Sequence, residues 1–270
     1  MQVHRSGYYQ WLEKPISDRE IENQKLLIQI KDAFKASNGV YGHRNIHKDL
    51  KELGIHVNKK RVARLMSEAK LYGVGTYKRK PYSKAGQAHK AYPNHLHQCF
   101  LSAKPNDTWV SDITYIRTRE GWIYLATVID LYSRKVIGWA TGHRQTTPLI
   151  IKALQMAVSR LSKDDEVILH SDQGSQYSSY DYKQVAKKYN IILSMSRRGN
   201  CYDNAVAESF FKTLKKELVR KQIFITRKDA ASKIFEYIEM FYNSKRRHSY
   251  LDYLSPNEFE KRYNLESLKS

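Results

Sequence analysis

The sequence predicts an α/β protein, with a mixed five-stranded sheet flanked by helices and a small all-α domain in front of it. Two observations carry this prediction. Apolar residues recur at helical spacing before residue 72 and at strand spacing after residue 108. The later strand-like runs then alternate with helix-like runs, which is the order of an α/β layer. A chain of 270 residues is long enough for one sizeable core and a smaller domain.

Three helix signals follow an N-terminal segment, residues 1–17, that shows no clear period. The expected helices begin at residue 18 and end before Asn38, span 44–53, and span 59–70, where Asn58 is placed as the N-cap. The last of them bears the basic residues Lys59, Lys60, Arg61 and Arg64. A helix, a glycine-containing turn and a basic helix suit a helix-turn-helix DNA reader, so residues 18–72 are predicted to form one. A three-helix bundle with a solvated basic face is the alternative.

The remaining chain divides into three predicted parts. Residues 73–104 have the composition of a basic linker, residues 105–220 form the sheet domain, and residues 221–270 form a C-terminal helical region. The expected strands are 109–116, 122–129, 135–140, 167–170 and 191–195, and the expected helices between them are 148–161 and 180–188. Three antiparallel strands followed by alternating helix and strand is the order of an RNase H-like layer. A last helix, 227–246, is expected to open with Thr226 and Asp229 as a capping box.

Charge and cysteine content narrow the class of protein. Lys and Arg number 47 against 27 Asp and Glu, a net charge of +20 that favours a polyanionic partner. Nucleic acid is the leading partner, and an anionic membrane leaflet is the alternative. The two cysteines, Cys99 and Cys201, exclude a disulfide framework and favour a reducing cytosol. Apolar stretches fall short of the roughly 20 residues of a membrane span, so a soluble, cytoplasmic protein is predicted.

Three acidic residues are the candidate catalytic and metal-binding groups. Asp112 lies mid-strand, where a structural strand would favour Val or Ile. Asp172 follows a buried-type strand and precedes Gly174, a position typical of ligand sites, although a simple turn residue is the alternative. Glu208 borders the apolar stripe of a helix, where an exposed glutamate is the alternative. Buried carboxylates need a compensating charge, and Mg²⁺ or Mn²⁺ in a basic protein suits phosphodiester chemistry.

Basic and polar residues around these acids are predicted DNA contacts. Lys215 follows Glu208 by two helical turns and can reach a phosphate. Arg197 and Arg198 lie in the loop before that helix. The complete set in this half of the chain is Arg197, Arg198, Asn204, Lys212, Lys215, Arg246 and His248. Asp130 and Asp203 are left out, because the first opens a turn and the second is expected to cap the Glu208 helix.

Several motifs give the chain a family resemblance. WxxDITY at 109–115, HSDxGxQY at 170–177 and DNAxxESFF at 203–211 resemble the integrase-type Asp-Asp-Glu catalytic core. YNxxRxH at 242–248 and YGxR at 41–44 resemble one bacterial subgroup, the insertion-sequence transposases whose second reading frame (OrfB) encodes the core. The resemblance covers roughly residues 6–262.

The resemblance implies a Mg-dependent polynucleotidyl transferase that cleaves and transfers DNA strands at insertion-sequence ends. It implies two Mg²⁺ or Mn²⁺ ions held by Asp112, Asp172 and Glu208. The implied partners are double-stranded DNA of transposon ends and target, further copies of this chain on that DNA, and the family's first-frame product. That product supplies a second helix-turn-helix and a leucine zipper, neither of which precedes Met1, so weak end binding by this chain alone is expected.

Two other functions stay open at this point. A structure-selective nuclease of the same fold would hydrolyse DNA strands without joining them. A non-enzymatic DNA-binding repressor would keep the fold with an inactive core.

Overall fold

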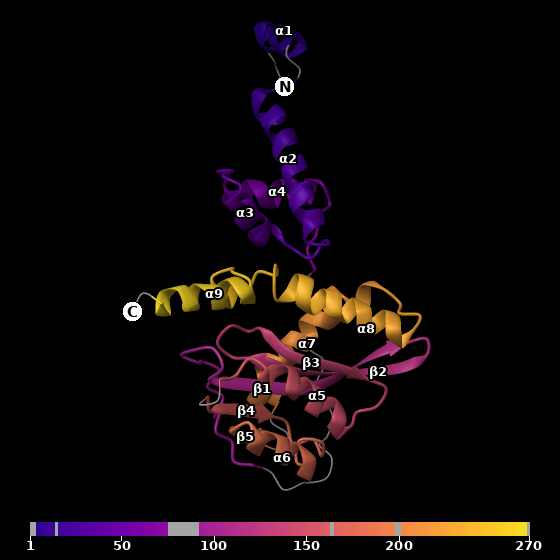
Figure 1. The fold of residues 1–270 in the computed structure, drawn as a ribbon. Coiled ribbons are helices and arrows are strands. Elements are labelled where there is room, and N and C mark those ends of the chain that lie inside the picture. The colour runs from indigo at the N-terminus through magenta and orange to yellow at the C-terminus, as the bar shows by residue number, and fades with distance from the viewer. Residues whose placement is uncertain (1–3, 14–15, 75–91, 163–164, 198–200, 269–270) are drawn as a thin grey trace. The chain divides into compact units, whose positions relative to one another are not determined.

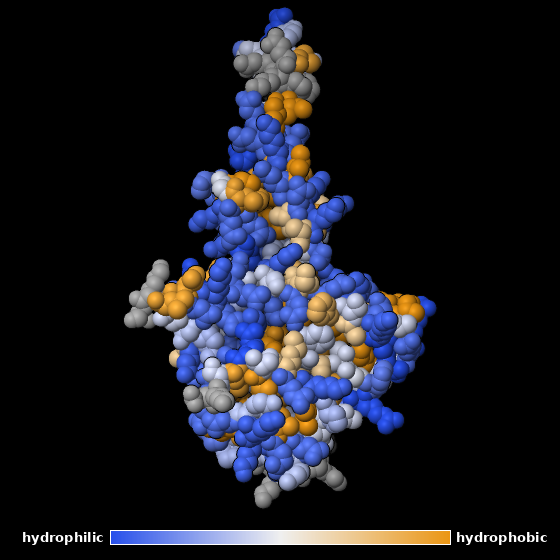
Figure 2. Space-filling model, viewed as in Figure 1, coloured by the Kyte–Doolittle hydropathy of each residue, from blue (hydrophilic) through white to orange (hydrophobic). Residues whose placement is uncertain are grey.

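The computed structural model describes residues 4–13, 16–74, 92–162, 165–197 and 201–268 (Figure 1). The chain divides into two compact units, Met1–Lys78 and Arg79–Ser270. Hydrophilic side chains cover most of the surface seen in Figure 2, in keeping with the high net charge. Within the described residues, every helix is too short or too polar to cross a bilayer.

The first unit is all helical. Its helices are α1 (Arg5–Glu13), α2 (Asp18–Ala36), α3 (His43–Glu52) and α4 (Lys59–Glu68). The last three pack on one another around Leu26, Ile30, Ile46, Leu50, Val62 and Leu65. Asn58 accepts a hydrogen bond from the Lys60 amide at 2.8 Å, which confirms it as the N-cap of α4. Helix α1 was not predicted, because exposed side chains such as Tyr8 and Tyr9 leave it no buried stripe that could give a period.

The second unit is built on a five-stranded mixed sheet of order β3-β2-β1-β4-β5. Its strands are β1 (Thr108–Thr118), β2 (Gly121–Asp130), β3 (Val136–Gly142), β4 (Val167–Ser171) and β5 (Ile191–Met195). The first three pair antiparallel, and β4 pairs parallel with both β1 and β5. This topology confirms the fold predicted from the strand order.

Helices cover both faces of the sheet (Figure 1). On one face, α5 (Thr147–Val158) and α6 (Tyr180–Lys188) bury a cluster that includes Trp109 and Ala126. Gly138 of β3 allows α5 to come close, because a Cβ there would lie 2.1 Å from the Ala153 carbonyl oxygen. On the other face, α7 (Ala205–Glu217) packs on β1, and α8 (Arg227–Phe235) packs on β2.

The C-terminal region differs from the single helix predicted over 227–246. Helix α8 passes into a π-helix, Glu236–Tyr242, and a later helix α9 (Pro256–Ser267) was not predicted. Thr226 accepts a hydrogen bond from the Asp229 amide at 3.0 Å and so caps α8 as expected. A full capping box forms instead at α9, between Ser255 and Glu258.

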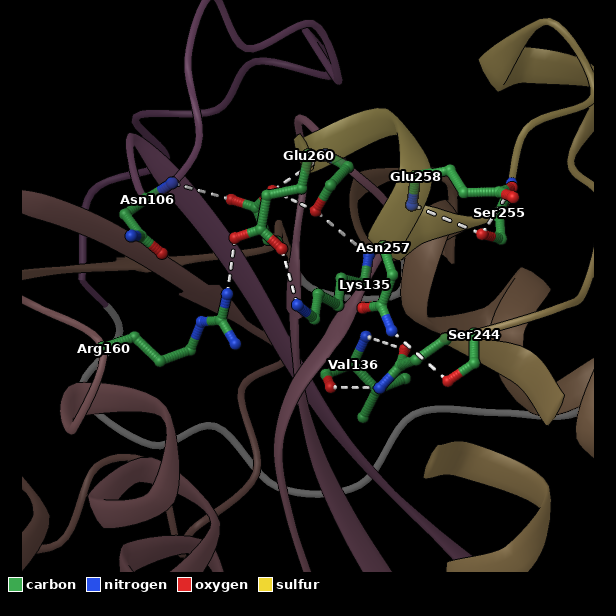
Figure 3. A network of polar contacts seen from close by, with 12 residues as sticks. Asn106, Lys135, Val136, Arg160, Ser244, Ser255, Asn257, Glu258 and Glu260 are labelled. Atoms are coloured by element: carbon green, nitrogen blue, oxygen red, sulfur yellow. Dashed lines mark hydrogen bonds and ion pairs between the residues drawn. The ribbon is translucent and has the colours of Figure 1, made fainter. Parts of the chain in front are cut away.

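Polar contacts hold this region against the sheet domain (Figure 3). Glu260 of α9 pairs with Lys135 at 2.6 Å and with Arg160. The Asn243 side chain donates to the Val136 carbonyl and accepts from the Val136 amide, both at 3.0 Å. These contacts make residues beyond 221 part of the same folded unit as the sheet.

The predicted linker 73–104 needs a correction. Residues 75–91 lie outside the described part of the chain, but residues 92–104 pack on the sheet domain. The Met195 amide donates to the Pro93 carbonyl at 3.3 Å, and the His95 amide donates to Ser194 Oγ at 2.9 Å. Leu96 is buried. A polar, basic composition concealed these contacts, because they are made mostly through backbone atoms.

Candidate active site

Strand register brings Asp112 beside Asp172. In the parallel pairing of β1 and β4, Thr108 lies opposite Ile168, and Val110 lies opposite His170. Continued for two residues past the last observed pair, the same register sets Asp112 level with Asp172, which follows the end of β4, and the charge of Asp172 acts on Asp112. Two acids far apart in the sequence are therefore carried by adjacent strands, Asp112 within β1 and Asp172 directly after β4.

Helix α7 presents Glu208 to the same strand. Its buried stripe of Ala207, Phe210, Phe211 and Leu214 packs inward, and Glu208 is half-buried at its edge, as the helical spacing predicted. Asn204, the N-cap residue of α7, is buried and donates through Nδ2 to the Ser111 carbonyl at 3.2 Å. Ser111 directly precedes Asp112, so the start of α7 is tied to the strand at the position of the first acid.

The charges of Asp172 and Glu208 both act on Asp112. Burial raises the pKa of Asp112 to about 8, and the charges of Asp172 and Glu208 contribute to the rise, against a lowering by the hydrogen bond from the Ile113 amide at 2.7 Å. Burial also raises the pKa of Asp172, while the Gly174 amide, 2.9 Å from Oδ1, opposes that rise. Asp112 is therefore a buried carboxyl whose ionised form is disfavoured first by dehydration and then by the neighbouring charges of Asp172 and Glu208.

Lys215 is a cation of this locus. Its charge lowers the pKa of Asp112, and burial lowers the pKa of Lys215 itself. Its Nζ lies 5.0 Å from the centroid of the Tyr115 ring. The ammonium group is therefore close to both the acids and an aromatic side chain on β1.

A divalent metal fits this donor set. Among the residues that the structure describes, no group of three or more His, Cys, Asp or Glu is arranged to hold a metal ion as it stands. The chemistry of the side chains fits Mg²⁺ or Mn²⁺ nonetheless, because carboxylate oxygens are the hard ligands that these ions prefer. Burial and, after it, the charges of Asp172 and Glu208 raise the pKa of Asp112, and a divalent cation would offset both effects.

Asp203 was predicted to cap the helix that bears Glu208, but the N-cap residue of α7 is Asn204. The Asp203 side chain is fully buried and accepts hydrogen bonds from Arg197, through the backbone amide at 2.8 Å and the guanidinium at 3.1 Å. It also accepts from Gln98 at 2.8 Å and Asn94 at 3.1 Å. The Arg197 hydrogen bonds hold the pKa of Asp203 well below its usual range. Asp203 therefore joins residues 94–98 to the turn that begins α7, a role without a local sequence signal.

The other predicted DNA contacts have varied surroundings. Lys212 is exposed on α7, and Arg198 lies outside the described residues. Arg246 forms hydrogen bonds of 2.8 to 3.1 Å with the buried carboxylate of Glu217. Burial lowers the pKa of His248 to about 3, so its ring is neutral. Contact of these residues with DNA stays a prediction.

The basic residues of α4 likewise include exposed side chains and one partly buried side chain that has partners within the protein. Lys59, Lys60 and Arg64 are exposed, and Arg64 pairs with Glu68 at 3.0 Å. Arg61 is partly buried, where it pairs with Glu22 at 3.1 Å and donates to Asn23 at 2.9 Å. Arg61 therefore also has a structural role within the first unit.

Comparison with known proteins agrees with these features. Residues 102–201 and 208–263 each match an "Integrase core domain" family, and residues 20–81 match the "HTH-like domain" family. The chain is 44% identical to "Transposase for insertion sequence element IS904" of Lactococcus lactis, over 91% of this chain and 97% of that protein. It is 42% identical to "Transposase InsF for insertion sequence IS3A" of Escherichia coli, over 96% and 91%. It is also 42% identical to "Insertion element IS600 uncharacterized 31 kDa protein" of Shigella sonnei, over 97% and 96%. These matches confirm the resemblance predicted from the sequence motifs.

The burial of Asp112, with the charges of Asp172 and Glu208, predicts a pH dependence of stability. The pKa of Asp112 is about 8 in the folded chain, against an ordinary value of 3.8. Between about pH 4 and pH 8 the folded state therefore holds a proton on Asp112 that the unfolded state has released. The free energy of unfolding therefore falls as pH rises through this window. Asp112→Asn removes this titration. The variant is expected to gain stability over the parent from about pH 4 to about pH 8, by at most about 1.4 kcal/mol per pH unit. Urea unfolding without divalent metal measures this, and a difference that does not change with pH would contradict it.

Proposed function

The chain belongs to the insertion-sequence transposases that carry an integrase core domain, and on that premise we propose that it cleaves and joins DNA strands at insertion-sequence ends. The observation that carries the proposal is the electrostatic coupling of Asp112, Asp172 and Glu208 beside Lys215. Such a locus suits phosphoryl transfer, since charge on the reacting phosphate must be neutralised where it develops.

Asp112, Asp172 and Glu208 would hold two Mg²⁺ or Mn²⁺ ions. When bound, such ions neutralise phosphate charge and activate a hydroxyl nucleophile near neutral pH. The Ile113 and Gly174 amides orient the carboxylates of Asp112 and Asp172 through hydrogen bonds of 2.7 and 2.9 Å. Hydrogen bonding by these amides also keeps a share of negative charge on the acids despite their burial.

The proposed chemistry is two successive in-line displacements. Water attacks a phosphodiester at the element's end and breaks its P–O3′ bond, which leaves a 3′-OH and a 5′-phosphate. That 3′-OH then attacks a phosphodiester of the target and forms a new bond to its phosphorus, while the target's own P–O3′ bond breaks and a 3′-OH leaves. No covalent bond to the protein is required, so the chain contributes position and charge. Lys215 would contact a phosphate oxygen, while Asp203 and Asn204 hold the start of α7 and with it the position of Glu208.

The first unit is proposed to bind DNA through α4. Lys59 and Lys60 are exposed in its first turn, which has no acidic residue. Cations at this end of a helix oppose the helix dipole, so their presence does not serve helix stability. We infer that Lys59 and Lys60 contact phosphate groups of DNA. Since two element ends must be brought together, further copies of the chain are expected in the DNA complex.

Neutral replacement of the acids tests the proposed chemistry. Asp112→Asn or Glu208→Gln is expected to reduce Mg²⁺-dependent strand cleavage by on the order of a thousandfold, because each removes a charge placed at the reacting phosphate. DNA affinity should change little. A gel assay with end-labelled DNA measures cleaved and joined strands separately, and Glu236→Gln on the exposed surface is the matched control. Full activity in either variant would refute the assignment, and cleavage without joined products would favour a nuclease.

Charge removal on α4 tests the proposed DNA contact. The double change Lys59→Ala and Lys60→Ala is expected to weaken DNA binding and to reduce the slope of log K against log salt by about 1 to 2. The exposed residues Lys25 and Lys31 of α2 supply a control pair with the same loss of charge. An unchanged slope, or an equal change in the control, would place the DNA contact elsewhere.

A further inference from the structure

The β1–β2 hairpin carries aromatic and cationic side chains on one face. In the antiparallel register Tyr115 lies opposite Tyr124, and Arg117 lies opposite Trp122, so these four residues point to the same side of the sheet. We call them the hairpin aromatic face. Tyr115 is 56% exposed and Trp122 is 44% exposed, with ring centroids 5.1 Å apart at 88°. Arg117 is exposed beside them.

Asp112, three residues before Tyr115 on β1, points to the opposite side of the sheet, so the aromatic face and the acids are related through Lys215 and not through a shared face. Strand β4 ends at Ser171, while β1 continues to Thr118, so the hairpin extends beyond the place where Asp112 and Asp172 meet. Lys215 lies near both the Tyr115 ring and Asp112. Its Nζ is 5.0 Å from the centroid of Tyr115, and its charge acts on Asp112. A DNA strand whose phosphate contacts Lys215 would therefore have its neighbouring nucleotide within reach of the rings.

Hairpin stability explains only part of this arrangement. A cross-strand aromatic pair stabilises a hairpin by the contact between its rings. That contact leaves about half of the surface of Tyr115 and of Trp122 in water, where apolar area gives no stability. Cationic groups also border the rings, with Arg117 on the face itself and Lys215 Nζ 5.0 Å from the centroid of the Tyr115 ring. Exposed rings among cations fit a ligand that is both flat and anionic.

We propose that the hairpin aromatic face binds an unpaired nucleotide of the DNA strand beside the scissile phosphodiester. This inference rests on the proposed function and extends it. Bases inside a duplex already stack on one another and present only their edges, so an aromatic ring can stack only on a base that has left the helix. Arg117 and Lys215 supply charge for the adjoining phosphates. Because every base has an aromatic face, the site should tolerate any base.

Binding without metal separates this inference from catalysis. The full chain is titrated, in EDTA, into a short fluorescent oligodeoxythymidine and, separately, into a duplex closed by loops at both ends. Tyr115→Leu and Trp122→Leu are each expected to raise the Kd for the single strand roughly tenfold, since each removes one stacking ring. The Kd for the closed duplex should not change. Tyr115→Phe, which keeps a ring, should bind the single strand as the parent does.

Two controls guard the interpretation. Tyr180→Leu removes a 73% exposed ring on α6 and should leave both affinities unchanged. Circular dichroism melting checks that the leucine variants fold. Unchanged single-strand binding in both leucine variants, or an equal loss on both DNAs, would overturn the inference. If the parent chain binds the single strand through these rings but does not cleave DNA with Mg²⁺, the inference stands and the proposed function is overturned. If it cleaves DNA but the leucine variants bind the single strand as the parent does, the proposed function stands and the inference is overturned.

Discussion

The burial of Asp112 within reach of the charges of Asp172 and Glu208 is the constraint on which the proposed site depends. Burial and the charges of Asp172 and Glu208 raise the pKa of Asp112 to about 8, so without a bound cation this carboxyl keeps its proton at neutral pH. The positive charge of Lys215 lowers the pKa of Asp112 but does not outweigh the burial. A site of this kind is under strain until a cation arrives, and that strain makes it suited to holding phosphate and metal together.

The fold brings the acids together through long-range contacts. Parallel pairing of β1 with β4 sets Asp112 beside Asp172, and α7 carries Glu208 across the same strand. The start of α7 is fixed from two sides, by Asn204 on the Ser111 carbonyl and by Asp203 on Arg197, Gln98 and Asn94. Asn94 and Gln98, which are distant in the sequence from the helix that bears Glu208, thus help to hold the start of that helix in position.

Much of this fold could be predicted from local patterns, and the exceptions have a common cause. The bounds of α6 and β5 were predicted as observed, because Tyr180–Lys188 and Ile191–Met195 have clear periods. Asp112 was recognisable as a mid-strand acid. The buried pairing of Asp203, the packing of residues 92–104 and the helix α9 were missed or misassigned. Each depends on partners distant in sequence, such as Gln98 with Asp203, or Lys135 with Glu260, which spacing does not reveal.

The most direct test of the shared metal locus is anomalous diffraction from crystals of the chain grown with Mn²⁺. A Mn²⁺ peak about 2.0 to 2.2 Å from carboxylate oxygens of both Asp112 and Asp172, with the Glu208 carboxylate turned toward it, is the expected result. Mn²⁺ bound only at other residues, with Glu208 facing bulk solvent, would contradict the account.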